Sequence, residues 1–158
     1  MMDVSQTRQE TDVQIVDIIH PKEVCRVGCW NVRTLYQTGK LAQVLKEMDR
    51  YNIQLLGTCE TRWTSSGSQK LATGHQILYS GKNDGQHSSS VGLILDRKLE
   101  KCMLEWKPFC DRLLSARFHV KYAKLTVIVC YDPTEDKEEE DKDCLRRIAE
   151  SCRRNTSP

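Results

Sequence analysis

Residues 29–34 are CWNVRT and residues 55–63 are LLGTCETRW, and these two stretches decide the fold. Each contains the end of an apolar strand pattern, which spans 24–30 in the first case and 53–57 in the second. Both patterns are apolar enough to be interior, as in a parallel or mixed sheet covered by helices. Polar side chains follow each strand directly, so the sequence predicts a functional site at the carboxyl ends of these strands.

A helix is predicted between the two strands. Its apolar positions follow the i, i+3, i+4, i+7 spacing of a helix that lies on a sheet, and they are Leu41, Val44, Leu45 and Met48. Strand, helix and strand form a crossover unit, in which the two strands run parallel and end at the same edge. We therefore expect Asn31 and Glu60 to emerge side by side.

The pair of Asn31 and Glu60 predicts a Mg²⁺ site, with Mn²⁺ as the second cation that such oxygen ligands accept. Mg²⁺ is a hard cation that takes one or two protein carboxylates together with waters and substrate phosphate. Arg33 and Arg62 lie next to this pair in the sequence and are suited to hold that phosphate.

Four more strands are predicted at Gln76–Ser80, Val91–Leu95, Leu113–Val120 and Leu125–Cys130. The links between consecutive strands are short, which favours antiparallel pairing in this part of the chain. Gly, Ser, Asn and Asp between 67 and 90 predict loops around the first of these strands. The predicted fold class is α/β (α+β), a mixed sheet with flanking helices.

Composition predicts one globular domain with charged ends. The chain has 158 residues, of which 39% are hydrophobic, and its mean hydropathy is −0.57. We expect a disordered or loosely attached segment at 1–22, a domain at 23–134 and a charged helical tail at 135–158. The net charge of +2 hides an asymmetry, because residues 132–143 hold eight Asp and Glu against two Lys. Residues 1–12 are predicted to be disordered, and 13–19 to be a short edge strand or an unattached segment.

The eight cysteines are spread along the chain without a Cys-x-x-Cys motif or a clustered Cys/His quartet. This spacing argues against both a zinc site and a disulfide scaffold. The sequence has no signal-peptide pattern and no run near the ~18 apolar residues of a membrane span, so no membrane association is predicted. We expect a reducing compartment, nuclear or cytoplasmic.

Five short motifs occur in order along the chain: WNVRT at 30–34, ETRW at 60–63, VGLIL at 91–95, DRL at 111–113 and YDPT at 131–134. Together they resemble the endonuclease/exonuclease/phosphatase superfamily, in particular the apurinic-type endonuclease domain of non-LTR (LINE) retrotransposons. The resemblance covers about residues 24–134. It implies an incomplete sandwich of the superfamily type, with DNA as a partner that the loops between 67 and 90 would meet.

The resemblance also implies roles for single residues. Asn31 would orient the scissile phosphate and the metal, Glu60 would be the metal-binding carboxylate, and Tyr131 would point its hydroxyl at the phosphate. Four further residues would lie at or near the surface that meets DNA, and these are Arg33, Arg62, Trp63 and Arg112.

Two departures from the superfamily pattern bear on activity. Arg33 stands where apurinic endonucleases often have a carboxylate, which removes a possible metal partner and adds a phosphate contact. A Gly-Asp-Phe-Asn strand end and a Ser-Asp-His segment should follow Tyr131 and do not. General-base assistance alone contributes about 10²–10⁴-fold in rate, so we expect little or no hydrolysis by this chain alone.

Each site residue has a structural alternative. Asn31 would then bond to its own backbone in a turn, and Glu60 would form a solvated pair with Arg62. Tyr131 would be a core aromatic whose hydroxyl finds a backbone partner.

Trp63 would cap the sheet, and Arg112 would form an ion pair with Asp111 or a neighbouring strand.

Two functions from different classes therefore stay open. The first is a Mg²⁺-dependent phosphodiesterase that nicks DNA by attack of an activated water. The second is a non-catalytic remnant that binds metal, nucleic acid or a protein. One sheet with its helices would leave an apolar inner face, through which the chain would self-associate or bind a partner protein.

Overall fold

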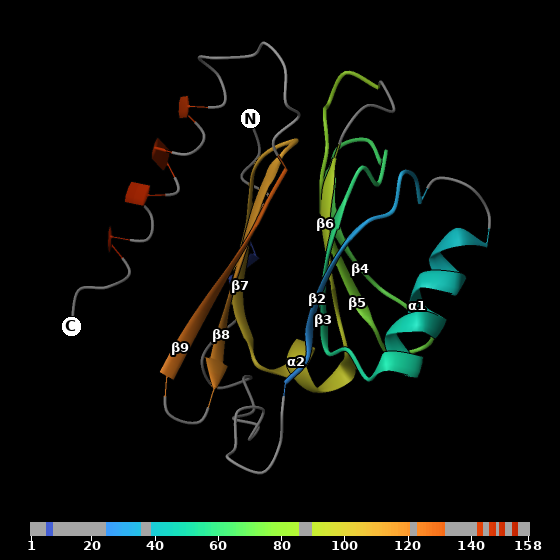
Figure 1. Cartoon of the computed structure of the whole chain (residues 1–158). Helices are drawn as coiled ribbons and strands as arrows, with labels where there is room; N and C mark the ends of the chain where they lie inside the picture. The colour runs from blue at the N-terminus through green and yellow to red at the C-terminus, as the bar shows by residue number, and fades with distance from the viewer. Residues whose placement is uncertain are drawn as a thin grey trace.

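The computed structural model describes residues 25–35, 39–85, 90–120 and 123–131, together with 6–7 and short stretches between 142 and 154. Two β-sheets pack face to face, and one helix covers the outer side of one sheet (Figure 1). The predicted α+β class is confirmed, and the architecture is a sandwich with three layers: helix, sheet and sheet.

The first sheet is mixed and has five strands in the order β2-β3-β6-β5-β4. Their bounds are Val27–Asn31 (β2), Leu55–Cys59 (β3), Ser66–Lys70 (β4), Gln76–Ser80 (β5) and Val91–Leu95 (β6). The pairing of β2 with β3 is parallel, and the other pairings are antiparallel. The predicted crossover unit and its parallel strand pair are therefore confirmed.

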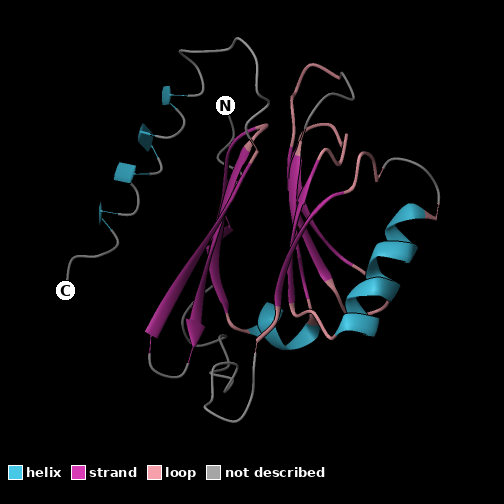
Figure 2. Ribbon diagram, in the orientation of Figure 1, coloured by secondary structure: helices cyan, strands magenta, loops and turns pink. Residues whose placement is uncertain are grey.

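The second sheet is antiparallel, in the order β1-β7-β8-β9. Figure 2 shows the strands of the molecule in two layers, with the larger helix on the outer side of one layer. Its strands are Gln6–Thr7 (β1), Met103–Cys110 (β7), Leu113–Val120 (β8) and Ala123–Cys130 (β9). From Leu114 onward, every second side chain of strand β8 is buried, because one face of the strand lies against the first sheet and the other does not. Leu113 is buried as well.

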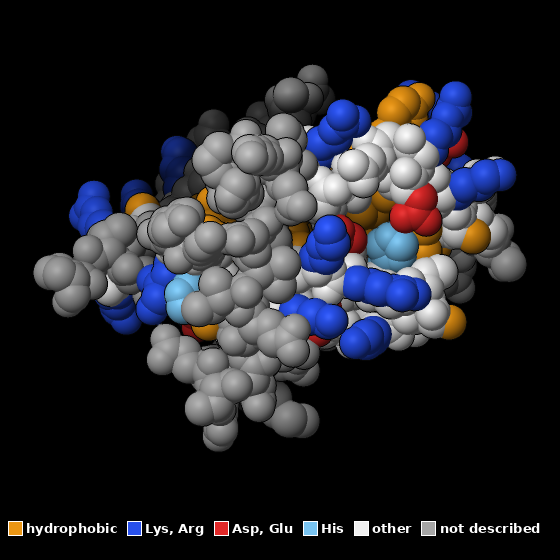
Figure 3. All heavy atoms as spheres, turned by 90° about the horizontal axis from the view of Figure 1, so that it is seen from below, with side chains coloured by type: hydrophobic (Ala, Val, Ile, Leu, Met, Phe, Trp, Pro, Cys, Tyr) orange, Lys and Arg blue, Asp and Glu red, His pale blue; other side chains and the backbone are white. Residues whose placement is uncertain are grey.

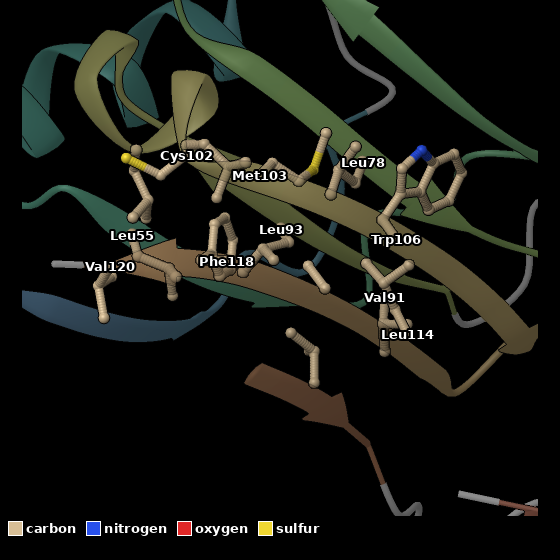
Figure 4. Packing of buried hydrophobic residues seen from close by; sticks show 14 residues of the cluster. Leu55, Leu78, Val91, Leu93, Cys102, Met103, Trp106, Leu114, Phe118 and Val120 are labelled. Atoms are coloured by element: carbon tan, nitrogen blue, oxygen red, sulfur yellow. The ribbon is translucent and has the colours of Figure 1, made fainter. Parts of the chain in front are cut away.

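The main core lies between the two sheets (Figure 4). Its largest members are at most 1% exposed, and they are Leu78, Leu93, Trp106, Leu114 and Phe118. They come from the facing sides of β5, β6, β7 and β8, so each sheet buries the apolar face of the other. At about 1.5–3 kcal/mol for a fully buried large apolar side chain, this layer is the principal source of stability.

Helix α1, Lys40–Tyr51, forms the outer layer. Its apolar stripe buries Val44, Leu45 and Met48 against Leu56, Ile77 and Ile94 of the first sheet, as the helical spacing predicts. The helix ends at Asn52, which adopts a left-handed conformation with φ 53° and donates its backbone N–H to the last turn.

A short second helix, α2 (Arg97–Lys101), connects β6 to β7 and so passes the chain from one sheet to the other. The side chain of Asp96 caps it by accepting a hydrogen bond of 2.8 Å from the backbone N–H of Leu99. The sequence prediction missed this helix, because five residues are too few to show a periodicity.

The structure corrects the expectation of one sheet with an uncovered inner face. Strands β7, β8 and β9 form a second sheet on that face, and β7 was not predicted from its sequence. On β2, at the edge of the first sheet, Val27 is 66% exposed. The premise for association through a whole uncovered sheet is therefore wrong.

Two smaller expectations also change. Strand β4 lies in the stretch from 67 to 90 that was predicted to be looped around a single strand, because Ser, Gly and Gln give it no apolar alternation. Gln6 and Thr7 pair with β7, in a segment that was predicted to be disordered.

The predicted edge strand at 13–19 lies outside the described residues. The described positions between 142 and 154 are helical. None of the described helices is both long and apolar enough to cross a membrane.

Candidate functional site

Asn31 and Glu60 lie side by side at the carboxyl ends of β2 and β3. The parallel register sets Asn31 opposite Cys59, and the backbone N–H of Val32 donates to the Cys59 carbonyl at 3.1 Å. Glu60 follows directly, and its carboxylate is hydrogen-bonded to the side-chain amide of Asn31. The predicted juxtaposition of these two residues is therefore present.

Tyr131 reaches the same point from the other sheet, since it follows β9. Its hydroxyl donates to Oε1 of Glu60 at 2.5 Å. Its own backbone N–H donates to the carbonyl of Arg112 at 3.0 Å, which fixes the start of the chain beyond β9 against the turn between β7 and β8. The Tyr131 to Glu60 bond thus joins the two sheets at one end of the sandwich.

The backbone around this cluster is unusual. Arg33, Glu60 and Arg62 have φ values of 57°, 58° and 59°. These values lie in the left-handed region, which residues other than glycine rarely adopt. Each such residue costs on the order of 1 kcal/mol, and conformations of this kind gather at functional sites. Three of them within two adjacent loops mark this edge of the sheet as a site that other contacts hold in place.

Hydrogen bonds keep the Glu60 carboxylate charged. The bond from Tyr131 lowers the pKa of Glu60 most, the bond from Asn31 lowers it further, and the positive charges of Arg62 and Arg33 add to the effect. The same bond to Glu60 raises the pKa of Tyr131. Between the pKa of Glu60 and the pKa of Tyr131, the phenol therefore stays protonated and the carboxylate stays ionised.

The donor set fits a hard divalent cation. Glu60 offers an ionised carboxylate, and the Oδ1 atom of Asn31 is oriented by accepting the backbone N–H of Arg33 at 3.1 Å. In the part of the chain that the structure describes, no group of three or more His, Cys, Asp and Glu is placed to hold a metal. An ion at Glu60 and Asn31 would therefore take most of its ligands from water and phosphate, as Mg²⁺ often does.

The four residues predicted to face DNA have three different environments. Arg33 and Arg62 are exposed, and their charges act on Glu60. Arg112 is only 8% exposed, and its positive charge acts on Tyr131. Trp63 instead packs edge-on against Tyr79, with ring centroids 5.3 Å apart, on the side of the sheet that α1 covers. This position matches the alternative in which Trp63 caps the sheet.

The thiol nearest to the site is that of Cys59. Burial raises its pKa to about 11, and the neighbouring Cys29 thiol adds to the rise. A thiol with this pKa is protonated at neutral pH, whereas nucleophiles and metal ligands are thiolates. The site is therefore built from oxygen and nitrogen groups, with Cys59 as an apolar neighbour.

Lys and Arg side chains also gather at the opposite end of the sandwich, which Figure 3 shows from below. This end carries α2 with Arg97, Lys98 and Lys101, and the end of β4 with Lys70. The basic charge there belongs to a different surface from Arg33 and Arg62. Because basic side chains lie at both ends of the sandwich, the net charge of the chain does not indicate where the candidate site is.

Two buried residues behind the site were not predicted. Thr61 and Ser90 are fully buried, and their hydroxyl groups are hydrogen-bonded to each other. The motif ETRW contains Thr61 at its second position, between the partly buried Glu60 and the exposed Arg62. A threonine between two polar residues in a loop gives no burial signal, so sequence analysis could not have found it.

The chain is similar in sequence to curated proteins over most of its length. It is 37% identical to the protein named craniofacial development protein 2 of Tragulus javanicus and of Bos taurus, in each case over 118 residues. The chain is homologous to craniofacial development protein 2. The matched part is 75% of this chain, but it spans only 20% and 19% of the two relatives. No protein-family model matches the chain. Homology to craniofacial development protein 2 is thus established for about a fifth of that protein's length.

Tyr131→Phe tests the contact that joins the two sheets. Removal of the hydroxyl takes away the largest cause of the lowered Glu60 pKa, so we expect the pKa of Glu60 to rise toward its ordinary value. A carboxyl group whose pKa is lowered by folding stabilises the folded state at pH values above the ordinary Glu pKa. This stabilisation is lost as the pH falls through the lowered pKa. In the variant, the loss on acidification should become smaller.

NMR titration of the Glu60 side-chain carboxyl carbon measures the shift. Tyr51→Phe is a matched control, because Tyr51 is 54% exposed on α1, far from the site. An unchanged Glu60 titration in Tyr131→Phe would show that the bond is absent in solution.

Proposed function

We propose that the chain carries the metal- and phosphate-binding part of a Mg²⁺-dependent DNA endonuclease site of the endonuclease/exonuclease/phosphatase superfamily, derived from a retrotransposon. One observation carries this proposal. An ionised carboxylate, Glu60, lies between the Asn31 amide and the Tyr131 hydroxyl, with two exposed arginines beside it. Such a set is suited to hold a divalent cation and a phosphodiester together.

Each residue has a part in this proposal. Glu60 and Asn31 would hold Mg²⁺, whose contribution when bound is to offset the negative charge on the phosphate oxygens. Arg33 and Arg62 would bind the phosphates on either side by charge-assisted hydrogen bonds. Tyr131 has one hydroxyl proton, which it donates to Glu60 in this structure and so holds the carboxylate in place. With substrate bound, Tyr131 would turn this proton toward a phosphate oxygen instead.

The proposal does not include efficient hydrolysis. The side chains hydrogen-bonded to Glu60 are those of Tyr131 and Asn31, and neither is a His or an Asp that could take a proton from the attacking water. A missing general base costs about 10²–10⁴-fold in rate. We therefore propose metal and DNA-backbone binding with little or no cleavage by this chain alone. The six described cysteines carry free thiols, which favours a reducing compartment, the nucleus or the cytoplasm.

Nicking of supercoiled plasmid tests the proposal together with a binding measurement. The chain, with Mg²⁺ and with Mn²⁺, should produce little open-circular DNA, yet it should retard the plasmid in a manner that weakens with salt. EDTA and Glu60→Gln are the controls. Absence of both nicking and metal-dependent binding in a folded sample contradicts the proposal.

A second candidate function is a protein-binding module, and one observation favours it. Strand β2 is the last strand of its sheet among the described residues, and its Val27 and Trp30 are 66% and 45% exposed. Exposed apolar residues on an edge strand invite pairing with another strand. Sedimentation of the chain over a range of concentrations, beside Val27→Asp, separates self-association from a monomer.

A further inference from the structure

Behind Glu60, a buried hydroxyl pair connects the loop after β3 to the strand β6. Thr61 and Ser90 are both 0% exposed, and their Oγ atoms are hydrogen-bonded to each other. Ser90 directly precedes β6, and the backbone N–H of Thr61 donates to its carbonyl at 3.3 Å. Thr61 is thus bound to Ser90 through both its backbone and its side chain.

Thr61 is also tied to the loop after β2. The backbone N–H of Leu35 donates to the Thr61 carbonyl at 2.9 Å. That loop carries Asn31 and Arg33, so Thr61 links the two loops from which the exposed site residues project. Its neighbours Glu60 and Arg62 are both left-handed, and such a conformation persists only where surrounding contacts determine it.

From this geometry we propose that the Thr61–Ser90 hydroxyl pair positions Glu60 against Tyr131 and Asn31. The pair anchors the residue between two strained positions and so fixes the direction in which the Glu60 side chain leaves the sheet. Thr61 and Ser90 are positioning residues and touch no substrate. Their importance for metal and phosphate binding rests on the proposed function, whereas the positioning itself does not.

The chain provides a matched control in Thr58. This residue is also a fully buried threonine near the end of β3, but its hydroxyl has no hydrogen-bond partner in the described structure. Thr58→Val therefore removes a buried hydroxyl without breaking a bond, whereas Thr61→Val leaves the Ser90 hydroxyl unpaired. The two variants differ in the contact and not in the kind of substitution.

A double-mutant cycle with Tyr131→Phe tests the positioning without metal or DNA. In the wild-type background we expect Tyr131→Phe to lower Tm by about 3 °C, through loss of the Glu60 hydrogen bond. In Thr61→Val the same change should lower Tm by less than about 1 °C, because Glu60 is no longer held within reach of Tyr131. Thr61→Ser keeps the hydroxyl and should restore the full shift, and Thr58→Val should leave it unchanged.

Equal Tm shifts for Tyr131→Phe in the wild-type and Thr61→Val backgrounds would overturn the proposal, since they would show that Thr61 contributes only to general stability. If Thr61→Val does not fold, Ser90→Ala removes the other hydroxyl and gives the same comparison. Mn²⁺ binding by the wild-type chain is measured separately. Its absence would refute the proposed function, while the cycle would still decide the role of Thr61.

Discussion

Glu60→Gln is expected to weaken Mn²⁺ binding by the chain about tenfold or more. The substitution keeps the size of the side chain but removes the negative charge, which is the charge that a divalent cation needs at this site. Loss of even a residue that supports a metal ligand costs about 10–100-fold in affinity, and the loss of a carboxylate ligand should cost no less.

Proton relaxation of water in the presence of Mn²⁺ measures this affinity. Glu47→Gln is the matched control, because Glu47 lies on α1 beside Arg50 and takes no part in the site. Equal Mn²⁺ affinity in wild type and Glu60→Gln would place the cation elsewhere on the protein. The same comparison with Asn31→Ala should show a smaller loss, since a neutral amide is a weaker ligand than a carboxylate.

Phe118→Ala is expected to lower the free energy of unfolding by about 3–5 kcal/mol. The Phe118 side chain is fully buried on β8, between the two sheets, in the cluster that includes Leu93 and Leu55 (Figure 4). Its removal leaves a cavity that two rigid sheets cannot close. Small domains have about 5–15 kcal/mol of stability in total, so this one change should remove a large share of it.

Urea unfolding followed by circular dichroism measures the loss. Ile128→Ala on β9 is the control, because Ile128 is 40% exposed, and it should cost less than about 1 kcal/mol. If Phe118→Ala were as mild as the control, the two sheets would not be packed face to face in solution.

The parts of the fold that the sequence predicts are those with strong local patterns. Strands β5, β6 and β8 have the predicted bounds, because apolar runs and strict alternation are visible within eight residues. The stripe of α1 predicts its buried face for the same reason. In contrast, β4 has no apolar pattern, and it forms a strand because β5 offers it a paired edge.

The existence of a second sheet on the inner face depends on long-range packing. Strand β7 runs from Met103 to Cys110 with an interrupted register against β8, so its sequence lacks a regular alternation. Its position depends on pairing with β8 and on the burial of Met103 and Trp106 between the sheets. For this reason the sequence suggested an exposed apolar face where the structure has a core.

The candidate site was partly predictable for a different reason. The positions of Asn31 and Glu60 follow from the parallel crossover, since strand ends meet at one edge of the sheet. The contact of Tyr131 with Glu60 joins residues 71 positions apart in two sheets. The family resemblance implied a site role for Tyr131, with its hydroxyl toward the phosphate, but it did not predict this contact. The roles of all three residues in binding metal and phosphate stay predictions.

The most direct test of the account is to locate Mn²⁺ on the folded chain by paramagnetic broadening in ¹H–¹⁵N NMR spectra. We expect broadening centred on the Asn31 side-chain amide and on the backbone amides of Thr61 and Val32, and its loss in Glu60→Gln. Broadening centred on the opposite end, around His75 and Asp49, or spread evenly over the protein, would contradict the assignment of this edge of the sheet as a metal site.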